Sequence, residues 1–305
     1  MQLETPLRKA TTEDIGLITE LVNLSNNTGA YGRGYPQGDF AGLEHEFEEI
    51  DKNLLDSFYI VGGSIGIIGI FNSPWGCYLI GPVFKPEHHT VENATAALEE
   101  VIALKKLRGK DILLDSVEEN QIIMQAANQA GFSNTYRGVS MAYPITAGEI
   151  RPVHSEVAEI NLSDKNFIAE IDKIFAADLK PWRRHDASDL VEHLADGNPI
   201  CVALLNGQVV GALVWSWDQE LEEGEIEYLC VANKYQGNGF AKDLMNFATN
   251  WVAAKLNQGE TATWYLDTER TNTQAIGYYE HYGFKVHYYR SAFNIETTRS
   301  VTETT

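Results

Sequence analysis

The stretch that decides the fold is residues 228–247, YLCVANKYQGNGFAKDLMNF. An apolar run ends at Val231, a polar loop follows, and an amphipathic pattern begins near Phe240. This order predicts a strand, a tight loop and a helix. The start of a helix carries unpaired N–H groups and a partial positive charge, so it attracts anions. Because Gly237 and Gly239 leave the main chain bare, the loop suits a diphosphate, although an ordinary strand-to-helix turn has the same features.

Two familiar nucleotide motifs are excluded at this loop. A Walker loop needs Gly-Lys followed by Ser or Thr, and that sequence is absent here. A dinucleotide-binding fingerprint needs three glycines at fixed spacing, which Asn238 and Ala241 do not supply. Gln236 and Asn238 add polar groups to the loop, and Ala241 keeps the start of the helix slim.

The stretch resembles the signature of the GNAT superfamily, the acyl-CoA-dependent N-acyltransferases. The family's phosphate loop reads Gln/Arg-x-x-Gly-x-Gly/Ala, and the matching residues here are Gln236, Gly239 and Ala241. Leu229 and Val231 match the Leu-x-Val pattern of the preceding strand. A later family motif, Asn-x-x-Ala-x-x-x-Tyr-x-x-x-Gly-Phe, is matched by Asn272, Ala275, Tyr279, Gly283 and Phe284. The resemblance covers about residues 150–295.

The resemblance implies that acetyl-CoA is the cosubstrate and that no metal takes part. Its diphosphate would bind the N–H groups of the loop from Gln236 to Ala241, which also includes Gly237, Asn238, Gly239 and Phe240. In the family, the signature strand is bulged and diverges from the next strand, and the pantetheine arm lies in the gap. Leu229, Cys230 and Val231 would lie along that arm, and an N–H near Val231 would polarise the thioester carbonyl. Asn272 would contact the arm, cap its helix or do both.

Acyl transfer to an amine requires two proton transfers. A lysine-like ammonium has a pKa near 10.4, so on the order of one molecule in a thousand is neutral at pH 7 and a base is needed. By resemblance the base is Glu225, ranked ahead of Glu227; both carboxylates share one face of a regular strand, and solvated surface charges are the alternative. Tyr279 matches the acid that protonates the departing thiolate, with a core tyrosine as the alternative. Cys230, on the opposite face from Glu225, is predicted to be a buried small hydrophobic residue.

Composition limits the other possibilities. The chain has 305 residues, a formal net charge of −20 and 44% hydrophobic residues, which suits about two globular domains. The acidic balance argues against non-specific nucleic-acid binding and is compatible with a cationic acceptor. Three isolated cysteines form no CxxC pair, and His45-Glu46 lacks the second histidine of a zinc-protease motif. Since no signal-peptide pattern or long apolar run occurs, we expect a cytoplasmic protein without a membrane association.

The chain contains an internal duplication. Asp115 and Asp267, Asn120 and Asn272, and the pairs Gly131-Phe132 and Gly283-Phe284 each lie 152 residues apart. The order of expected helices and strands also repeats. We therefore predict an α/β (α+β) fold of two tandem GNAT-like domains, each a mixed, mostly antiparallel sheet flanked by helices. The predicted bounds are 1–147, 148–296 and a flexible tail at 297–305.

The first copy is predicted to be degenerate. Its equivalent loop, VFKPEHHTVENA, has no glycine, and Glu87 and Glu92 would place negative charge where a phosphate would bind. Ala127 stands at the position equivalent to Tyr279. The neighbouring His88 and His89 are a weak indication of a metal site. This copy would shape the acceptor site or take the place of a dimer partner.

The resulting hypothesis is an N-acetyltransferase that acts by direct attack, in its second domain, on a primary amine of a small molecule or peptide. A non-catalytic acyl-CoA sensor and a scaffold without either function are the alternatives. Residues 180–184, KPWRR, would line the acceptor site, or their arginines are solvated charges. Trp215 and Trp217 would line the same pocket or pack in the core. The sequence is compatible with a monomer or a homodimer.

Overall fold

A computed structural model describes residues 6–28, 54–73, 76–104, 107, 109–178 and 186–296 of the chain. Three predictions therefore concern segments outside the described residues: the incomplete zinc motif at His45-Glu46, the acceptor loop at 180–184 and the tail at 297–305. Within the described ranges, no helix has both the length and the apolar character to cross a membrane. Cys77, Cys201 and Cys230 are buried, and none of the three is part of a disulfide in the described part of the chain.

The chain forms two compact units that do not coincide with its two sequential halves. One unit comprises Met1–Val139 with Tyr288–Thr305, and the other comprises Ser140–His287. The strands β6 (Ser133–Thr146) and β12 (Lys285–Glu296) each contribute to both units. The predicted boundary at 147/148 divides the chain by sequence order. In the structure, the last strand of each repeat, β6 or β12, extends into the unit that the other repeat forms.

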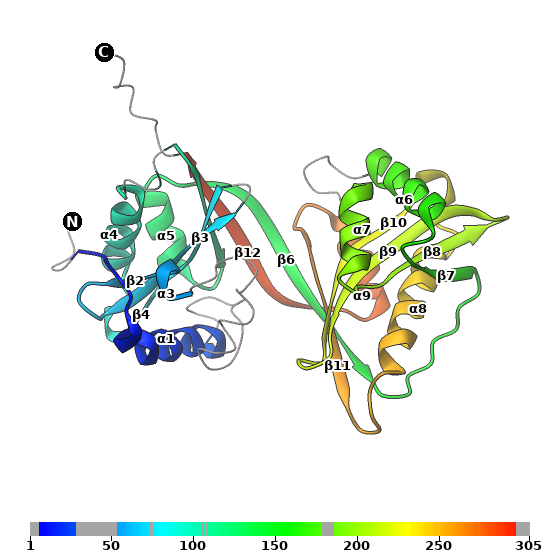
Figure 1. The fold of residues 1–305 in the computed structure, drawn as a ribbon, viewed down its shortest axis with the longest axis horizontal. Helices are drawn as coiled ribbons and strands as arrows, with labels where there is room; N and C mark the ends of the chain where they lie inside the picture. The colour runs from blue at the N-terminus through cyan, green and yellow to red at the C-terminus, as the bar shows by residue number, and fades with distance from the viewer. Residues whose placement is uncertain are drawn as a thin grey trace, which may run out of the picture. The chain divides into compact units, whose positions relative to one another are not determined.

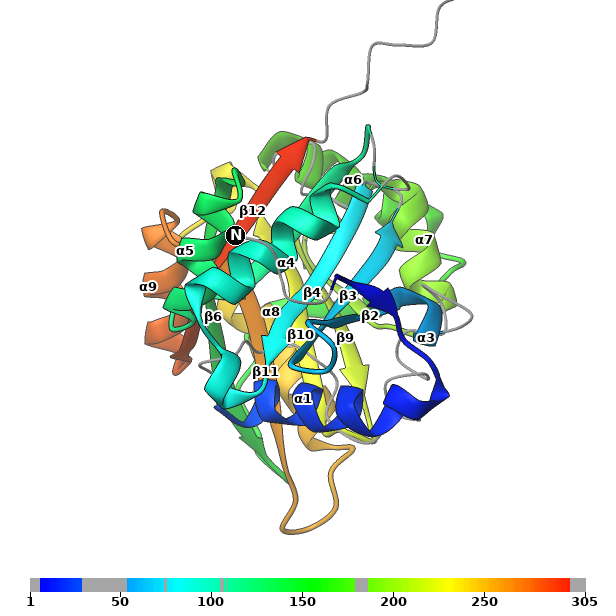
Figure 2. The ribbon, with the colours of Figure 1, turned by 90° about the vertical axis from the view of Figure 1, so that its left-hand side faces the viewer.

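The first unit is a mixed sheet with helices packed on it (Figure 1). Its strands run in the order β1-β2-β3-β4-β5-β12-β6. The helices α4 and α5 pack side by side on the hydrophobic core formed with β2–β5 (Figure 2). The remaining bounds are β1 (Arg8–Lys9), α1 (Ile15–Thr28), α3 (Leu54–Ser57), β2 (Phe58–Val61), β3 (Gly66–Ser73), β4 (Gly76–Phe84), α4 (Val91–Ile102), β5 (Asp111–Val117) and α5 (Gln121–Gln129).

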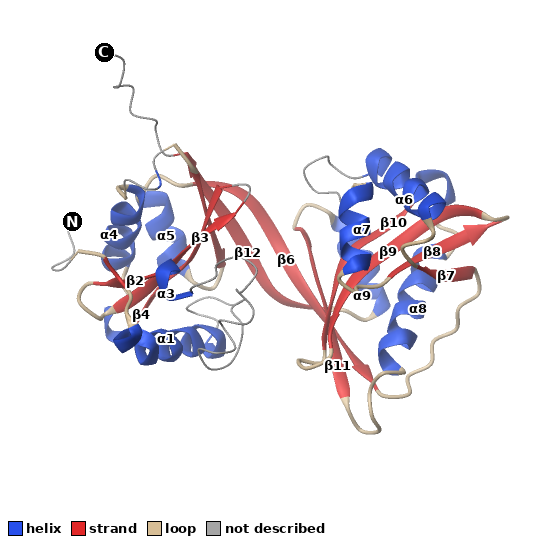
Figure 3. Ribbon diagram, viewed as in Figure 1, coloured by secondary structure: helices blue, strands red, loops and turns tan. Residues whose placement is uncertain are grey.

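The second unit has the same arrangement around the strand order β6-β11-β10-β9-β8-β7. The helices α6 and α7 cover one face of this sheet, and α8 covers the other (Figure 3). Positive φ angles at Asn206 and Gly207 form the predicted hairpin turn between β8 and β9. The bounds are β7 (Glu156–Ile160), α6 (Lys165–Asp178), α7 (Ala187–Ala195), β8 (Ile200–Leu205), β9 (Gln208–Asp218), β10 (Glu223–Val231), α8 (Phe240–Ala253), β11 (Thr261–Glu269) and α9 (Thr273–Tyr282).

The duplication read from the sequence appears in matching elements. The helices α5 and α9 begin at Gln121 and Thr273, which lie 152 residues apart, and β6 and β12 begin with the same offset. Each of the two helices is capped by an asparagine: Asn120 accepts a bond from the Ile123 N–H, and Asn272 accepts one from the Ala275 N–H. The predicted α/β fold of two tandem repeats, each a mixed sheet flanked by helices, is therefore confirmed.

A half-buried polar cluster fastens β6 and the following segment into the second unit. The Arg151 guanidinium donates from Nε to Glu149 Oε1 at 2.6 Å and lies 4.5 Å from the centre of the Tyr282 ring. The Tyr143 hydroxyl donates to the same Glu149 oxygen at 2.8 Å. Burial, followed by this bond to Glu149, raises the pKa of Tyr143 to about 12. These contacts link a strand of the first repeat to helix α9 of the second.

The exchange of strands predicts where core substitutions act. Phe293 of β12 is fully buried in the core of the first unit, so Phe293→Ala should lower the free energy of unfolding of that unit by about 3–5 kcal/mol. Hydrogen exchange should accelerate in β3–β5 and not in β8–β10. Met141→Ala in β6, which is buried in the second unit, should give the converse pattern. Acceleration of β8–β10 in Phe293→Ala would contradict the exchange.

Candidate functional site

Strand β10 carries a bulge at Glu227. Ile226 pairs with Trp215 and Tyr228 pairs with Val214, so one residue of β10 has no counterpart on β9. A bulge of this kind redirects side chains and increases the local twist of the strand. The period-two alternation of side chains therefore breaks within the segment that carries the two candidate carboxylates.

The bulge changes the predicted face of Cys230. Glu225 pairs with Ser216 and Cys230 with Ala212. Because these two partners lie four residues apart on β9, Glu225 and Cys230 point to the same side of the sheet. The prediction that Cys230 faces away from Glu225 was wrong, since it assumed a regular strand. Its burial, which was also predicted, is confirmed, and it packs in the core beneath α6 and α7.

The two central strands of the second unit diverge beyond the bulge. The parallel ladder between β10 and β11 extends from Glu223↔Thr263 to Ile226↔Leu266. On its other side, β10 stays paired with β9 as far as Val231↔Gly211. The segment that contains Leu229, Cys230 and Val231 thus follows the point where the β10–β11 ladder ends. This is the arrangement that the resemblance implied for a strand beside a pantetheine arm.

The glycine loop, residues 236–241, is open at the start of α8. Gly237 and Gly239 have φ angles of 78° and 91°, which favour glycine. A Cβ atom built on either glycine would meet no heavy atom within 4 Å. Gly239 is the N-cap of α8 and has no side chain that can accept from the first-turn N–H groups. The start of this helix therefore offers donors and space to an anion.

The polar side chains of the glycine loop stabilise its shape. Gln236 donates from Nε2 to the Val231 carbonyl at 2.9 Å, which connects the loop to the end of β10. Asn238 donates from Nδ2 to the Tyr235 carbonyl at 3.0 Å. Phe240 is buried and packs edge-on against the Tyr235 ring. In the structure the two amides thus hold the loop, and Phe240 fixes the start of the helix in the core.

Asp243 in the first turn of α8 makes a structural contact with Ser155 that was not predicted from the sequence. Its carboxylate is buried and accepts a bond from the Ser155 N–H at 2.8 Å. Burial acts to raise the pKa of Asp243, but hydrogen bonds from Ser155 outweigh it, so the pKa is lowered and the group is anionic at neutral pH. An acidic residue in the first turn of a helix is typical of residues that accept hydrogen bonds near the helix start, so this role could have been predicted.

Tyr279 lies at the inner face of α9. It is buried, and its ring packs against Tyr278 and Phe284. Burial raises the pKa of the Tyr279 hydroxyl, and the nearby Cys230 thiol adds to this rise. The phenol is therefore a neutral hydrogen-bond donor at physiological pH. Its interaction with Cys230 places it near the segment of β10 that has left the β11 ladder.

The two candidate carboxylates differ in their surroundings. Glu225 is exposed, whereas the Glu227 side chain is 23% exposed and its Oε1 lies 3.6 Å from His193 Nδ1. His193, from α7, is buried and was not singled out by the sequence analysis. No sequence motif contains His193, and a single histidine in a helix does not by itself predict a functional role. Its position beside the bulge is visible only in the folded structure.

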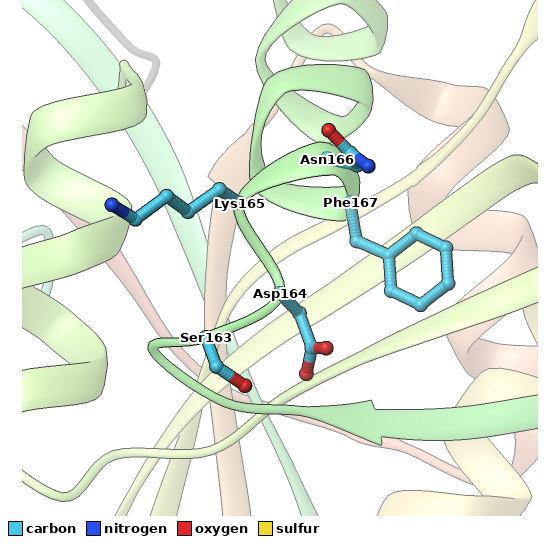
Figure 4. A pocket seen from close by; sticks show the side chains of 5 residues that line it. All are labelled: Ser163, Asp164, Lys165, Asn166 and Phe167. Atoms are coloured by element: carbon cyan, nitrogen blue, oxygen red, sulfur yellow. The ribbon is translucent and has the colours of Figure 1, made fainter.

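The tryptophans of β9 have different environments. Trp215 is fully buried and its ring packs edge-on against Trp251 and Trp264, so it belongs to the core rather than to a pocket wall. Trp217 is half-buried. A small hollow at the start of α6, lined by residues 163–167, is shown in Figure 4. Its Asp164 accepts from the Asn161 N–H at 2.9 Å, so a carboxylate already occupies this helix start.

The equivalent loop of the first unit is closed by side chains. Thr90 caps α4 by accepting from the Asn93 N–H at 3.2 Å, and the Asn93 amide donates to the His88 carbonyl. Ala127, the counterpart of Tyr279, is fully buried. Although the β4–β5 ladder also ends early, at Leu79↔Leu114, no open glycine cradle follows it. Within the described parts of the chain, His, Cys, Asp and Glu side chains form no group of three that could hold a metal.

Comparison with known proteins agrees with this geometry. Residues 168–284 match the acetyltransferase (GNAT) family. The fold is similar to a GCN5-related N-acetyltransferase from Sphaerobacter thermophilus, with a TM-score of 0.66, 13% identity and 97% of each chain covered. It is equally similar to a tandem GNAT protein from the clavulanic acid biosynthesis pathway, solved without AcCoA: TM-score 0.66, 12% identity, 97% of this chain and 98% of that one. Among curated protein sequences, none matches this chain.

The capping asparagines provide a matched test of the helix starts. Asn272→Ala should lower the free energy of unfolding by about 1 kcal/mol, because the Ala275 N–H loses its acceptor. Asn120→Ala should have a similar or larger effect, since Asn120 is buried. Chemical denaturation of the two variants measures both values. A neutral Asn272→Ala would show that this residue does not cap α9 in solution.

Proposed function

We propose that the chain is an N-acetyltransferase, because residues 168–284 match the acetyltransferase (GNAT) family and the fold is similar to that of a tandem GNAT protein. It would transfer the acetyl group of acetyl-CoA to a primary amine by direct attack, in the second unit. The observation that carries the proposal is the open glycine loop at the start of α8, next to a strand that diverges from its neighbour.

The glycine loop fits the diphosphate of a coenzyme. The first-turn N–H groups and the positive end of the α8 dipole favour an anion with several oxygens. A pantetheine arm would then extend beside Leu229, Cys230 and Val231, where the β10–β11 ladder has ended. A main-chain N–H near Val231 would polarise the thioester carbonyl as negative charge develops on its oxygen.

The proton transfers are assigned to β10 and α9. A carboxylate of β10, from Glu225 or Glu227, would remove a proton from the acceptor ammonium. The Tyr279 hydroxyl would donate to the departing thiolate, and its burial keeps it protonated for that role. No covalent enzyme intermediate is required. Cys230 is not needed as a nucleophile, because burial in an apolar core does not favour a thiolate.

The acceptor is proposed to be a small-molecule or peptide amine. Acidic residues precede and occupy the start of β10, namely Asp218, Glu220, Glu222, Glu223 and Glu225. This charge favours the approach of a cationic amine from solution. The first unit, whose α4 is capped by Thr90, would not bind the cosubstrate. A non-catalytic acyl-CoA sensor is the second candidate, and it shares the open loop.

Cosubstrate binding is tested by two glycine variants. Acetyl-CoA at about a hundred times its dissociation constant should stabilise the protein by roughly 2.7 kcal/mol in thermal unfolding. Gly239→Glu should abolish this shift, because it places a carboxylate in the glycine loop. Gly259→Glu is the matched control: Gly259 has a φ of 92°, against 91° for Gly239, and equally open surroundings. If Gly239→Glu is still stabilised by acetyl-CoA, the phosphates bind at another place in the protein.

The acid role of Tyr279 is tested by removing one hydroxyl. Tyr279→Phe should lower kcat with an amine acceptor by about a hundredfold or more, within the usual range for a general acid. Affinity for acetyl-CoA should be unchanged. Tyr278→Phe is the control, because the buried Tyr278 hydroxyl has no hydrogen-bond partner in the described structure. If wild type and Tyr279→Phe have the same kcat, Tyr279 is not the general acid.

The sensor alternative makes a separate prediction. A sensor would show the acetyl-CoA stabilisation and release no free thiol with any member of an amine panel. The proposed enzyme releases one thiol for each amide formed. Binding without turnover across amino acids, polyamines and lysine peptides would therefore favour the sensor.

A further inference from the structure

A chain of buried hydrogen bonds joins α9 to α8. The Tyr282 hydroxyl, on α9, lies 3.1 Å from Asn246 Oδ1 and 3.0 Å from Thr249 Oγ1, both on α8. The Trp264 indole N–H, on β11, donates to the same Thr249 oxygen at 3.2 Å. Asn246 and Thr249 are 1% and 0% exposed, so these bonds are shielded from solvent.

The two ends of this chain define which groups donate. An indole N–H only donates, so Thr249 accepts from Trp264 and its own proton is directed to Tyr282. The Asn246 amide nitrogen donates to the Pro152 carbonyl at 2.7 Å, which leaves the amide oxygen facing Tyr282. The Tyr282 hydroxyl therefore donates to Asn246 and accepts from Thr249. Buried networks of this kind rigidify the elements that they join.

Helix α8 is itself held by the segment that precedes β7. Three polar side chains of α8, about one turn apart, bind the main chain of residues 151–155: Asn250 at Arg151, Asn246 at Pro152 and Asp243 at Ser155. The Arg151 guanidinium, from the same segment, lies 4.5 Å from the centre of the Tyr282 ring and also acts on its hydroxyl. Helix α8 is therefore a fixed support against which α9 is placed.

The proposed general acid lies one turn from this anchor. Tyr279 and Tyr282 are the two buried residues of α9, and their spacing of three puts them on one face of the helix. Tyr279 is held by ring packing against Tyr278 and Phe284. In the part of the chain that the structure describes, the side-chain hydrogen bonds between α9 and α8 all involve Tyr282. The direction of the Tyr279 hydroxyl therefore depends on Tyr282.

We propose that Tyr282 is a positioning residue, whose hydroxyl fixes α9 on α8 so that the Tyr279 hydroxyl points to the place where the thiolate departs. This inference rests on the proposed acetyltransferase function. Tyr282 acts through Tyr279 and does not itself contact the reacting atoms. A phenylalanine would fill almost the same volume, but the Asn246 oxygen would lose a buried donor. A displacement of about 1 Å in a catalytic group can lower a rate by about a hundredfold.

A double-mutant cycle tests whether Tyr282 acts through Tyr279. Tyr282→Phe should lower kcat with an amine acceptor by about tenfold, within the loss that misplacement of a catalytic group causes, and leave the Kd for acetyl-CoA unchanged. In the Tyr279→Phe background, Tyr282→Phe should cause no further loss of kcat, because the group that it positions is absent. Losses that multiply in the double variant would overturn the proposal.

Tyr143→Phe is the matched control for this cycle. Tyr143 is a half-buried residue of the same unit, and its hydroxyl donates to Glu149 rather than to α8. The control thus loses a hydroxyl and keeps the ring, as Tyr282→Phe does, and it should retain the wild-type kcat. If Tyr143→Phe lowers kcat as much as Tyr282→Phe does, the loss reflects a general loosening of the unit and the proposal is overturned.

A spectroscopic measurement tests the positioning without turnover. In protein labelled with ¹³Cζ-tyrosine, the Tyr279 resonance is identified by its loss in Tyr279→Phe. Tyr282→Phe should shift the Tyr279 resonance in the protein without acetyl-CoA, whereas Tyr143→Phe should leave it unchanged. An unchanged Tyr279 resonance in Tyr282→Phe would show that the Tyr282 hydroxyl does not place Tyr279.

The outcomes separate this inference from the function on which it rests. An active wild-type chain whose Tyr282→Phe variant has the same kcat overturns the role of Tyr282. A wild-type chain that binds acetyl-CoA and acetylates no amine overturns the proposed function, and the ¹³C measurement still decides whether Tyr282 places Tyr279. If Tyr282→Phe fails to fold, Thr249→Val removes a partner of Tyr282 on α8 and should give the same cycle with Tyr279→Phe. Multiplied losses in that second cycle would also contradict the role of Tyr282.

Discussion

The open start of α8 is the constraint on which the functional account depends. A glycine at the N-cap leaves the first-turn N–H groups without a capping side chain. The surrounding structure holds this helix end in place: Phe240 is buried, Asp243 binds Ser155, and Gln236 binds the end of β10. The first unit shows the alternative, because Thr90 caps the equivalent helix with its own hydroxyl. At these equivalent helix starts, the two repeats therefore differ in whether a side chain caps the first-turn N–H groups.

The bulge at Glu227 connects this binding site to the proposed chemistry. It lies at the point where the β10–β11 ladder ends, so one irregularity accompanies both the divergence of the strands and the placement of a carboxylate. It also directs Glu227 toward the buried His193. A regular strand would keep the alternation of side chains and would put Cys230 on the other face.

Local patterns made much of the fold predictable. Asn206-Gly207 predicted the hairpin between β8 and β9, and the 152-residue offset predicted the matching starts of α5 and α9. Gly237 and Gly239 predicted the open loop before α8. These signals are local in sequence, and each has a direct conformational cause. The similarity of element order also explains why the architecture could be predicted from one well-matched half.

Other features depend on tertiary pairing and left no local signal. A one-residue bulge does not change the composition of a strand, so the face of Cys230 was predicted wrongly. The exchange of β6 and β12 was not predicted because equivalent strands complete either unit with the same order of elements. His193 becomes informative through its distance to Glu227, which no spacing in the sequence encodes.

The most direct test of the central claim is a titration of the full chain with acetyl-CoA, followed by the backbone amide resonances of both units. The account predicts that the largest shifts occur at the N–H groups of residues 237–242, with smaller shifts along residues 229–231. It also predicts no comparable change at the start of α4. Large shifts at α4, with the amides of the glycine loop unchanged, would contradict the claim that the start of α8 binds the coenzyme diphosphate.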